Sequence, residues 1–358
     1  MKRNLHTTFL SLLLISVIVV ITASCNNDTK NESDSSSNIN IDKFSSEEVL
    51  CINSSELNVQ EDTEYYKSFL NNGGIILVYN DAANSNSLCK NLDMQVETGW
   101  SETDLAAIYY IYGNNLSGTY IINAQNNIAT SEKERLIKEA IDEVSTIQST
   151  GKYYLADISD IALGNIIISS ASYPEGTLTA KYEFFTAQNH FEKDYYTVKA
   201  TVTGNPGAVL ASDNSNCESK YQGVSQNTTI KAISSSVLLD AYGPQTTDDN
   251  ENYHVSIGDT LYETNNEVLK ADFNYSKPLP NATIEANCTR NIAIWNVSLE
   301  KEARTDTSVF VPAVTFSCPE AKSSVDLNLS SSYTADSWNT LKKTISSSRD
   351  VTLNPAKQ

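Results

Sequence analysis

The stretch Leu178-Thr-Ala-Lys-Tyr-Glu-Phe184 decides the fold class, because a large or apolar residue stands at every second position. The same alternation recurs at Tyr196, Val198, Ala200 and Val202, and at Ile292 and Ile294 followed one register later by Val297 and Leu299. Successive side chains of a strand point to opposite faces, so this period indicates half-buried β-strands. Turn signals separate the runs at 174–176, 204–207 and 243–244. The sequence therefore predicts a β-rich, sandwich-like domain over residues 166–345.

The region before it mixes helical and strand patterns. Ser131-Glu-Lys-Glu134 is a capping box, and the apolar residues that follow have helical spacing, which predicts a helix. A second helix is expected from Ser101 to Gly113, and a third from Glu61 to Leu70. Short apolar runs at 75–78 and 120–122 predict buried strands. We therefore expect a small α/β domain over residues 51–165, and the predicted fold class is α+β.

The N-terminus has the layout of an export signal. Lys2 and Arg3 precede an apolar run from Phe9 to Ile21, which is shorter than the roughly 20 residues that a membrane-spanning helix needs. The ending Thr22-Ala-Ser-Cys25 resembles the lipobox of bacterial lipoproteins, in which the cysteine is acylated. An ordinary secretory signal beside a chance cysteine is the alternative. We predict a signal peptide over residues 1–24, and both interpretations place the mature protein outside the cytoplasm.

Polar segments flank the predicted domains. Residues 25–50 are rich in Asn, Ser and acids, so they are expected to be a disordered tether between lipid and domain. Residues 346–358 are also polar and are expected to fray.

Charge and cysteine content narrow the partners. The chain has 44 acidic and 25 basic residues, a formal net charge of −19 that argues against nucleic acid as a partner. It has six cysteines, and an exported protein lies where disulfides persist. With Cys25 set aside, the first predicted pair is Cys288 with Cys318 and the second is Cys51 with Cys89, which leaves Cys217 unpaired. The spacing leaves the other connectivities open.

The sequence offers little material for catalysis. Motifs of zinc proteases, nucleophile elbows, phosphate-binding loops and dinucleotide-binding turns are absent from it. His190 and His254 are interpreted as solvent-facing residues, and the acidic runs 213–216 and 248–251 as solvated loops that do not match a calcium-binding loop. We therefore predict neither an enzyme nor a metal or cofactor site.

Residues 252–276, called the hairpin from here on, read as two alternating strands about the polar turn 263–267. Each arm is about 9–11 residues long, which is the length that a tilted strand needs to cross a bilayer. Asp259 interrupts the apolar side, and Gly258 is the only glycine of the segment. The residues predicted to face lipid are Tyr253, Val255, Ile257, Leu261, Leu269, Ala271, Phe273 and Tyr275.

The order of segments around the hairpin resembles the leukocidin/haemolysin family of β-barrel pore-forming toxins. Leu239-Asp-Ala-Tyr-Gly-Pro244 leads into the hairpin, Tyr275-Ser-Lys-Pro-Leu-Pro280 leaves it, and the Trp-centred segment Ile292-Ala-Ile-Trp-Asn-Val297 follows. Upstream, Lys193-Asp-Tyr-Tyr-Thr-Val198 is similar to the strand with which such β-domains begin. The resemblance covers residues 180–335 and implies a β-domain that self-associates and inserts one hairpin per subunit.

Two functions follow as hypotheses. The first is an envelope lipoprotein, on the outer membrane or the cell surface, held to the bilayer by an acylated Cys25 and acting through self-association and insertion of the hairpin. The second is a non-lytic binding module in which the same β-domain recognises a glycan or a surface protein. The nineteen tyrosines suit both, because aromatic rings serve cores, sugar stacking and interfaces.

Overall fold

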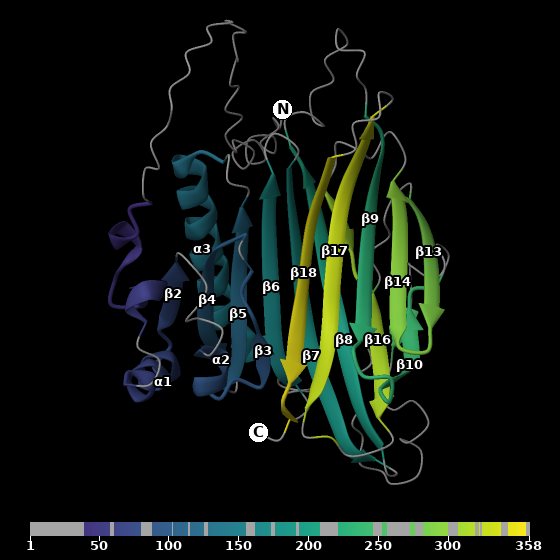
Figure 1. Cartoon of the computed structure of the whole chain (residues 1–358), viewed down its shortest axis with the longest axis horizontal. Coiled ribbons are helices and arrows are strands. Elements are labelled where there is room, and N and C mark those ends of the chain that lie inside the picture. Colours follow the sequence, from purple (N-terminus) through teal and green to yellow (C-terminus); the bar gives the residue numbers. More distant parts are fainter. Residues whose placement is uncertain are drawn as a thin grey trace, which may run out of the picture. The chain divides into compact units, whose positions relative to one another are not determined.

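Figure 1 shows the computed structural model of the chain. All described residues belong to one compact unit that begins at residue 38. The structure describes residues 39–57, 61–79, 88–101, 103–113, 115–124, 128–154, 162–172, 176–190, 193–207, 221–245, 253–255, 273–275, 282–299, 307–318, 322, 324–337 and 343–355.

A ten-stranded sheet, called the large sheet, runs through the whole unit. The pairs β1–β2 and β5–β6 are parallel, and β15 (Ser308–Phe310) lies beside β8, off the main order. The main order is β1 (Val49–Asn53), β2 (Ile75–Tyr79), β4 (Asp104–Tyr112), β5 (Leu116–Ala124), β6 (Ala162–Ser172), β7 (Gly176–His190), β8 (Lys193–Pro206), β16 (Ala313–Cys318) and β10 (Leu238–Gly243).

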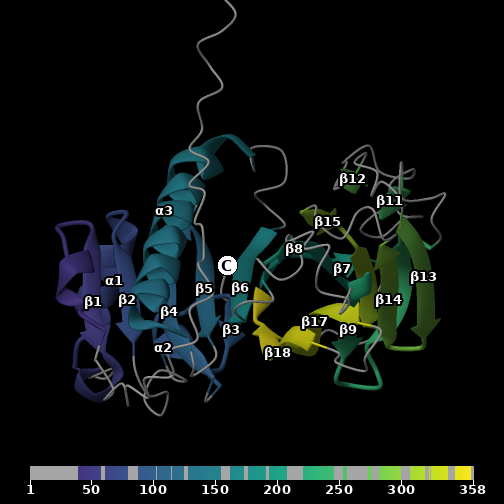
Figure 2. The same cartoon turned by 90° about the horizontal axis from the view of Figure 1, so that it is seen from above.

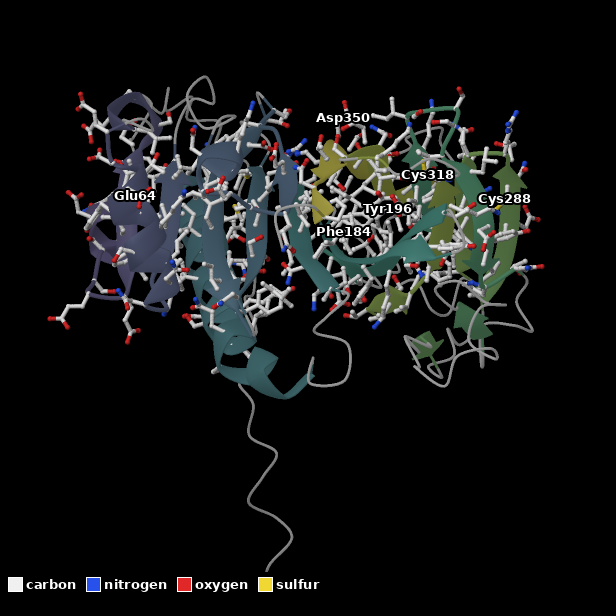
Figure 3. The ribbon with its side chains drawn as sticks, turned by 90° about the horizontal axis from the view of Figure 1, so that it is seen from below. Glu64, Phe184, Tyr196, Cys288, Cys318 and Asp350 are labelled. Atoms are coloured by element: carbon white, nitrogen blue, oxygen red, sulfur yellow. The ribbon has the colours of Figure 1, made fainter. Side chains whose placement is uncertain are left out.

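A six-stranded antiparallel sheet, called the second sheet, packs against part of the large sheet. Phe184 of β7 and Tyr196 of β8 lie between the two sheets with Trp295 and Leu329, and Figure 3 labels the first two. Alternating apolar residues of both sheets thus form the sandwich core. The strand order is β13 (Ala282–Thr289), β14 (Ile292–Leu299), β9 (Tyr221–Ala232), β17 (Val325–Ser337), β18 (Lys343–Leu353) and β3 (Val96–Thr98).

Helices cover the rest of the large sheet. Helix α1 (Thr63–Asn71) and the short helix α2 (Leu88–Asn91) bury Leu70 and Leu88 in the same core cluster as the second sheet. The long helix α3 (Thr130–Tyr154) buries Leu136, Ile137, Ala140 and Val144 against the opposite face. In Figure 2, α3 and the β17–β18 pair lie on opposite sides of the large sheet. Two short 3-10 helices, Asp42–Phe44 and Ser54–Glu56, flank β1.

The structure confirms the sandwich and most of the predicted elements. The alternating residues of 178–184 and 196–202 are all buried in the core, as predicted. The helix expected after the capping box is α3, and the helix expected from Glu61 is α1. The apolar runs 75–78 and 120–122 lie in β2 and β5. In β14, however, the register is continuous, and Ala293 and Trp295 face the core in place of Ile292 and Ile294.

The helix predicted from Ser101 to Gly113 is wrong, because these residues form strand β4. Ala107 and Tyr109 contribute to the cluster shared with the second sheet, and Ile108 and Tyr110 to the cluster under α3. A strand buried on both faces is a continuous apolar run, and its spacing matches a buried helix equally well. Its aromatic and β-branched residues favour the strand.

The predicted boundaries also need correction. Residues 165 and 166 lie inside β6, and the large sheet continues across them. The prediction of a disordered tether over 25–50 is wrong at its C-terminal end, because Ile41 and Val49 are buried; residues 25–38 lie outside the described residues. The tail expected over 346–358 is part of β18 up to Leu353, which is fully buried. Its alternation is hard to recognise, because Ser347 and Arg349 occupy inward positions.

Candidate functional site

The base of the hairpin is an antiparallel pair of short strands, β11 (Tyr253–Val255) and β12 (Phe273–Tyr275). Tyr253 pairs with Tyr275, and Val255 pairs with Phe273. Directly paired positions of two antiparallel strands lie on one face of the ribbon. Between these two pairs, His254 pairs with Asn274. The remaining predicted lipid-facing residues, Ile257, Leu261, Leu269 and Ala271, lie outside the described residues.

The hairpin lies in the connection between the two sheets. The strand before it, β10, is the last strand of the large sheet, and the strand after it, β13, is the first strand of the second sheet. Both ends of the hairpin are therefore attached to edge strands, which carry backbone groups without a neighbour in the sheet.

A buried tryptophan fixes the chain where it leaves β10. The peptide bond Gly243–Pro244 is cis, and the indole Nε1–H of Trp295 donates to the carbonyl oxygen of Pro244 at 2.8 Å. Trp295 is fully buried and also contacts the ring of Tyr242 edge-on, with centroids 6.5 Å apart. A tryptophan at this position thus joins the second sheet to the start of the connection.

The β11–β12 ribbon lies on the face of the large sheet that is turned away from the second sheet, the same side as α3 (Figures 2 and 3). Strand β11 contacts β10 and β16. On β16, Val314 and Phe316 point into the sandwich, so Thr315 points to the ribbon side. The hydroxyl oxygens of Thr315 and Thr197 are 2.8 Å apart and buried. Thr197 and Thr315 thus give this face hydroxyl side chains, which gain less from burial than apolar side chains do.

The structure contradicts both predicted disulfides, because Cys51, Cys89, Cys288 and Cys318 are free thiols in it. Cys51 packs on the α3 side of the large sheet and Cys89 on the opposite side, so the sheet separates them. Burial, together with the charge of Asp42, raises the pKa of Cys51 to about 11, and burial also raises the pKa of Cys89. Thiols with a raised pKa carry little of the reactive thiolate. Figure 3 labels Cys288 and Cys318. Cys25 and Cys217 lie outside the described residues.

The described part of the chain contains no group of three or more His, Cys, Asp or Glu residues arranged to hold a metal ion. Within that part, no helix combines the length and the apolar composition needed to span a membrane. The acidic runs 213–216 and 248–251 lie outside it.

Sequence reasoning missed two features. Trp295 was recognised only as part of a pattern, and its bond to Pro244 depends on a contact between distant segments. A cavity beside α1, lined by residues of several elements, was not predicted, because no local motif marks a surface assembled from four segments.

No protein family model matches the chain, and no curated protein matches its sequence. Comparison with solved structures finds a pore-forming protein at 14% identity and a TM-score of 0.31, covering 54% of this chain and 92% of that one. The Clostridium perfringens delta-toxin matches at 12% identity and a TM-score of 0.29, covering 72% and 95%. The Clostridium perfringens NetB toxin in its membrane-inserted form matches at 9% and 0.24, covering 54% and 96%.

These three solved structures are thus pore-forming proteins, matched at low identity and low TM-score. Identities this low bear on fold alone.

Proposed function

We propose that the chain is an exported, lipid-anchored protein that self-associates and inserts the hairpin, residues 252–276, into a membrane. The observation that carries the proposal is the position of the hairpin between the edge strands of the two sheets. A segment attached at two sheet edges can extend away from the body without breaking a strand pair inside either sheet.

The register at the base of the hairpin supports a lipid-facing side. Tyr253 pairs with Tyr275, so in a continued antiparallel register each odd-numbered residue pairs with another odd-numbered residue. All eight predicted lipid-facing residues have odd numbers and would share one face, while the even-numbered positions would face water. Asp259 is also odd-numbered, but it stands two residues from the end of the apolar arm at Leu261, where a charge costs less than at mid-bilayer.

Self-association follows from the chemistry of the backbone in lipid. One hairpin presents two open edges, and each unpaired N–H or C=O group in hydrocarbon costs several kcal/mol. Several copies arranged in a closed ring satisfy all of these groups. The proposal therefore includes a homo-oligomer on the membrane.

A matched pair of variants tests insertion. The measurement is the release of dye from liposomes by the purified chain, with oligomers on the liposomes counted by electron microscopy. Ile257→Arg places a charge on the proposed lipid face, where an arginine costs about 2–4 kcal/mol at mid-bilayer. Ser256→Arg, the neighbouring position, places the same charge on the proposed water-facing side.

We expect wild type and Ser256→Arg to release dye and Ile257→Arg to release little. No leakage and no oligomer with wild type at any tested pH or lipid composition would reject the proposal. Equal leakage by the two arginine variants would reject the proposed face.

The anchor has a test of its own. We propose that Cys25 becomes the acylated first residue of the mature chain and holds the protein in the cell envelope. Stable anchoring through this residue requires more than one acyl chain or a second signal. Mass spectrometry of the mature N-terminus is expected to find lipid on Cys25. A mature chain that begins elsewhere without lipid would refute the anchor and leave the hairpin proposal standing.

A further inference from the structure

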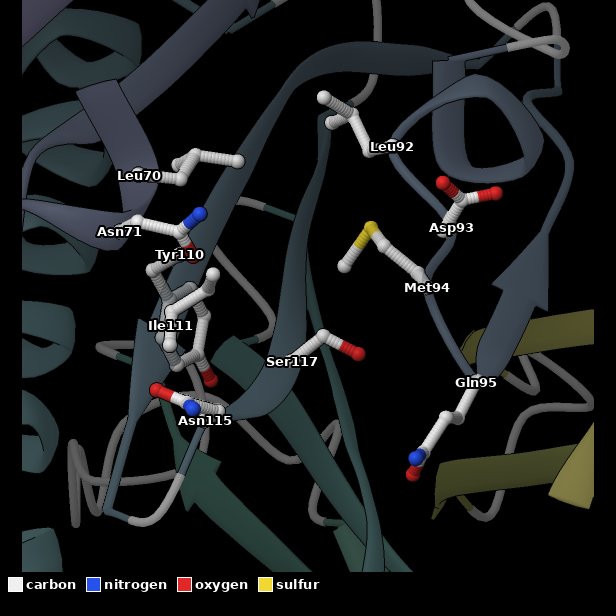
Figure 4. A pocket seen from close by; sticks show the side chains of 10 residues that line it. All are labelled: Leu70, Asn71, Leu92, Asp93, Met94, Gln95, Tyr110, Ile111, Asn115 and Ser117. Atoms are coloured by element: carbon white, nitrogen blue, oxygen red, sulfur yellow. The ribbon is translucent and has the colours of Figure 1, made fainter. Parts of the chain in front are cut away.

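We propose that the cavity beside α1 binds a small neutral polyhydroxy ligand of monosaccharide size. The cavity has a volume of about 190 Å³ and lies between the end of α1, the segment that joins α2 to β3, and the β4–β5 turn (Figure 4). This site is separate from the hairpin and does not depend on its insertion.

The walls of the cavity are held by defined backbone conformations. Helix α1 ends with Gly73 at φ +87°, where Gly73 N–H donates to Leu70 C=O and Gly74 N–H to Phe69 C=O. Helix α2 ends in the same way, with Asp93 at φ +55° and Met94 N–H donating to Cys89 C=O. These are Schellman motifs, which fix the direction of the chain after a helix. The cavity therefore exists before a ligand arrives, which lowers the entropic cost of binding.

The cavity has an apolar floor and a polar rim. Leu70 and Met94 are buried in the core cluster, so they present hydrocarbon at the bottom. Asn71 and Asn115 are exposed at the opening. A sugar ring has both kinds of surface. Its C–H groups can pack on hydrocarbon, and its hydroxyls can donate hydrogen bonds to amide side chains and accept hydrogen bonds from them.

Two buried polar atoms of the lining residues have no hydrogen-bond partner. They are Ser117 Oγ and Gln95 Oε1, and Ser117 is only 8% exposed. In Figure 4 the side chain of Ser117 points toward Met94 and Gln95 across the cavity. Buried polar atoms without a partner are uncommon in folded proteins. A serine side chain has three staggered rotamers, so its hydroxyl can turn to a ligand at small cost.

The lining indicates that the ligand is neutral. It contains no Lys, Arg or His. Its one carboxylate, Asp93, is largely exposed and already pairs with Lys67, whose Nζ is 2.5 Å from Asp93 Oδ2. A charged ligand would therefore meet no free opposite charge. The volume is several times the ~30 Å³ that one water molecule takes up and below the roughly 300–1,000 Å³ of pockets for drug-sized ligands.

The test is calorimetric titration of the purified chain with glucose, galactose, mannose and N-acetylglucosamine, and with glucuronate and glucosamine as charged counterparts. Ser117→Ala removes the hydroxyl and is expected to weaken binding roughly tenfold, the value of about one hydrogen bond. Ser117→Leu fills the cavity and is expected to abolish binding. The matched control is Ser170→Ala, because Ser170 is also buried with an unpartnered hydroxyl but does not line the cavity.

We expect at least one neutral sugar to bind saturably and Ser170→Ala to bind it as wild type does. The absence of saturable binding by all four neutral sugars would overturn the proposal. Equal effects of Ser117→Ala and Ser170→Ala, or tighter binding of a charged counterpart, would do the same. Dye release from liposomes is expected to be unchanged in Ser117→Ala, which separates this proposal from the insertion of the hairpin.

Discussion

Arg349 and Asp104 form an ion pair that is buried between strands of the two sheets. Arg349 lies on β18, Asp104 lies at the start of β4, and their side chains are 7% and 0% exposed. Asp104 also accepts from the backbone N–H of Ser101 at 2.7 Å. The sequence did not predict this pair, because Arg349 stands in a segment that looked like a polar tail, 245 positions from its partner.

Replacing the arginine is expected to destabilise the fold strongly. Arg349→Met leaves Asp104 buried without its partner, and breaking a buried pair costs about 3–5 kcal/mol of unfolding free energy. The measurement is urea unfolding followed by circular dichroism. The control is Arg135→Ala, which removes surface ion pairs with Glu132 and Glu139 and is expected to cost at most about 1 kcal/mol. Equal effects of the two variants would show that the buried pair contributes no more to the unfolding free energy than the surface pairs do.

The same ion pair makes the stability of the fold depend on pH. Burial raises the pKa of Asp104 above its ordinary value, although the charge of Arg349 opposes the shift. A raised pKa in the folded state stabilises the fold at low pH, and this contribution is lost as the pH rises from about 3.9, the unfolded value, through the folded pKa. We expect the unfolding free energy of wild type, relative to Asp104→Asn, to fall over this range. A relative stability that increases with pH would mean that Arg349 lowers the pKa of Asp104 below its unfolded value.

At the scale of elements, the second sheet carries a row of hydroxyl side chains into the sandwich core. Thr228 of β9, Ser331 of β17 and Ser347 of β18 are directly paired across three neighbouring strands, and all are buried. Tyr182 of the large sheet bonds to Ser331 at 2.7 Å, whereas the hydroxyls of Thr228 and Ser347 have no partner. An unpartnered buried hydroxyl opposes folding by about 1–3 kcal/mol.

Two threonine-to-valine changes of equal shape are therefore expected to have opposite signs. Thr228→Val removes an unpartnered hydroxyl and is expected to raise the unfolding free energy by roughly 1 kcal/mol or more. Thr197→Val removes the 2.8 Å hydrogen bond between Thr197 and Thr315 and is expected to lower the unfolding free energy by about 1 kcal/mol. Thermal unfolding of both variants beside wild type gives the comparison. A destabilised Thr228→Val would indicate that ordered water satisfies this hydroxyl.

The elements also show which parts of the fold can be predicted from local sequence. Strands with one buried face, such as β7 and β8, have the period that the sequence predicts, and α3 has the predicted apolar spacing, although it begins at Thr130, before the predicted capping residue Ser131. Strand β4 was mistaken for a helix because burial on both faces removes that period. At the hairpin, sequence predicted the arms, and the pairing of Tyr253 with Tyr275 comes from the structure. The cavity depends on segments that only the fold brings together.

At the scale of the whole molecule, one continuous sheet replaces the two predicted domains. Strands β5 and β6 are paired in parallel across the expected boundary, with α3 as their connection. The short strand β3 belongs by sequence to the α/β region but pairs with β18 of the second sheet. Composition changes near residue 165, yet a change of composition does not reveal which strands will pair.

Removing β18 is therefore expected to prevent folding. A chain that ends at residue 342 loses the buried residues Ile345, Val351 and Leu353. Each contributes about 1.5–3 kcal/mol, which together approaches a typical total stability of about 5–15 kcal/mol. Limited proteolysis and thermal melting are expected to find this chain unfolded, whereas a chain that ends at residue 355 melts like wild type. A cooperative melt of the shorter chain would show that folding does not require β18.

The pairing of β3 with β18 also determines when the second sheet can form during synthesis of the chain. Residues 96–98 and 351–353 are joined in one sheet, so the earlier strand has no neighbour in that sheet until nearly all of the described chain has been synthesised. Pairings between distant segments form slowly, because a long loop must close first. The nascent chain must therefore stay incompletely folded while it emerges, and the second sheet is completed only after β18 has been made.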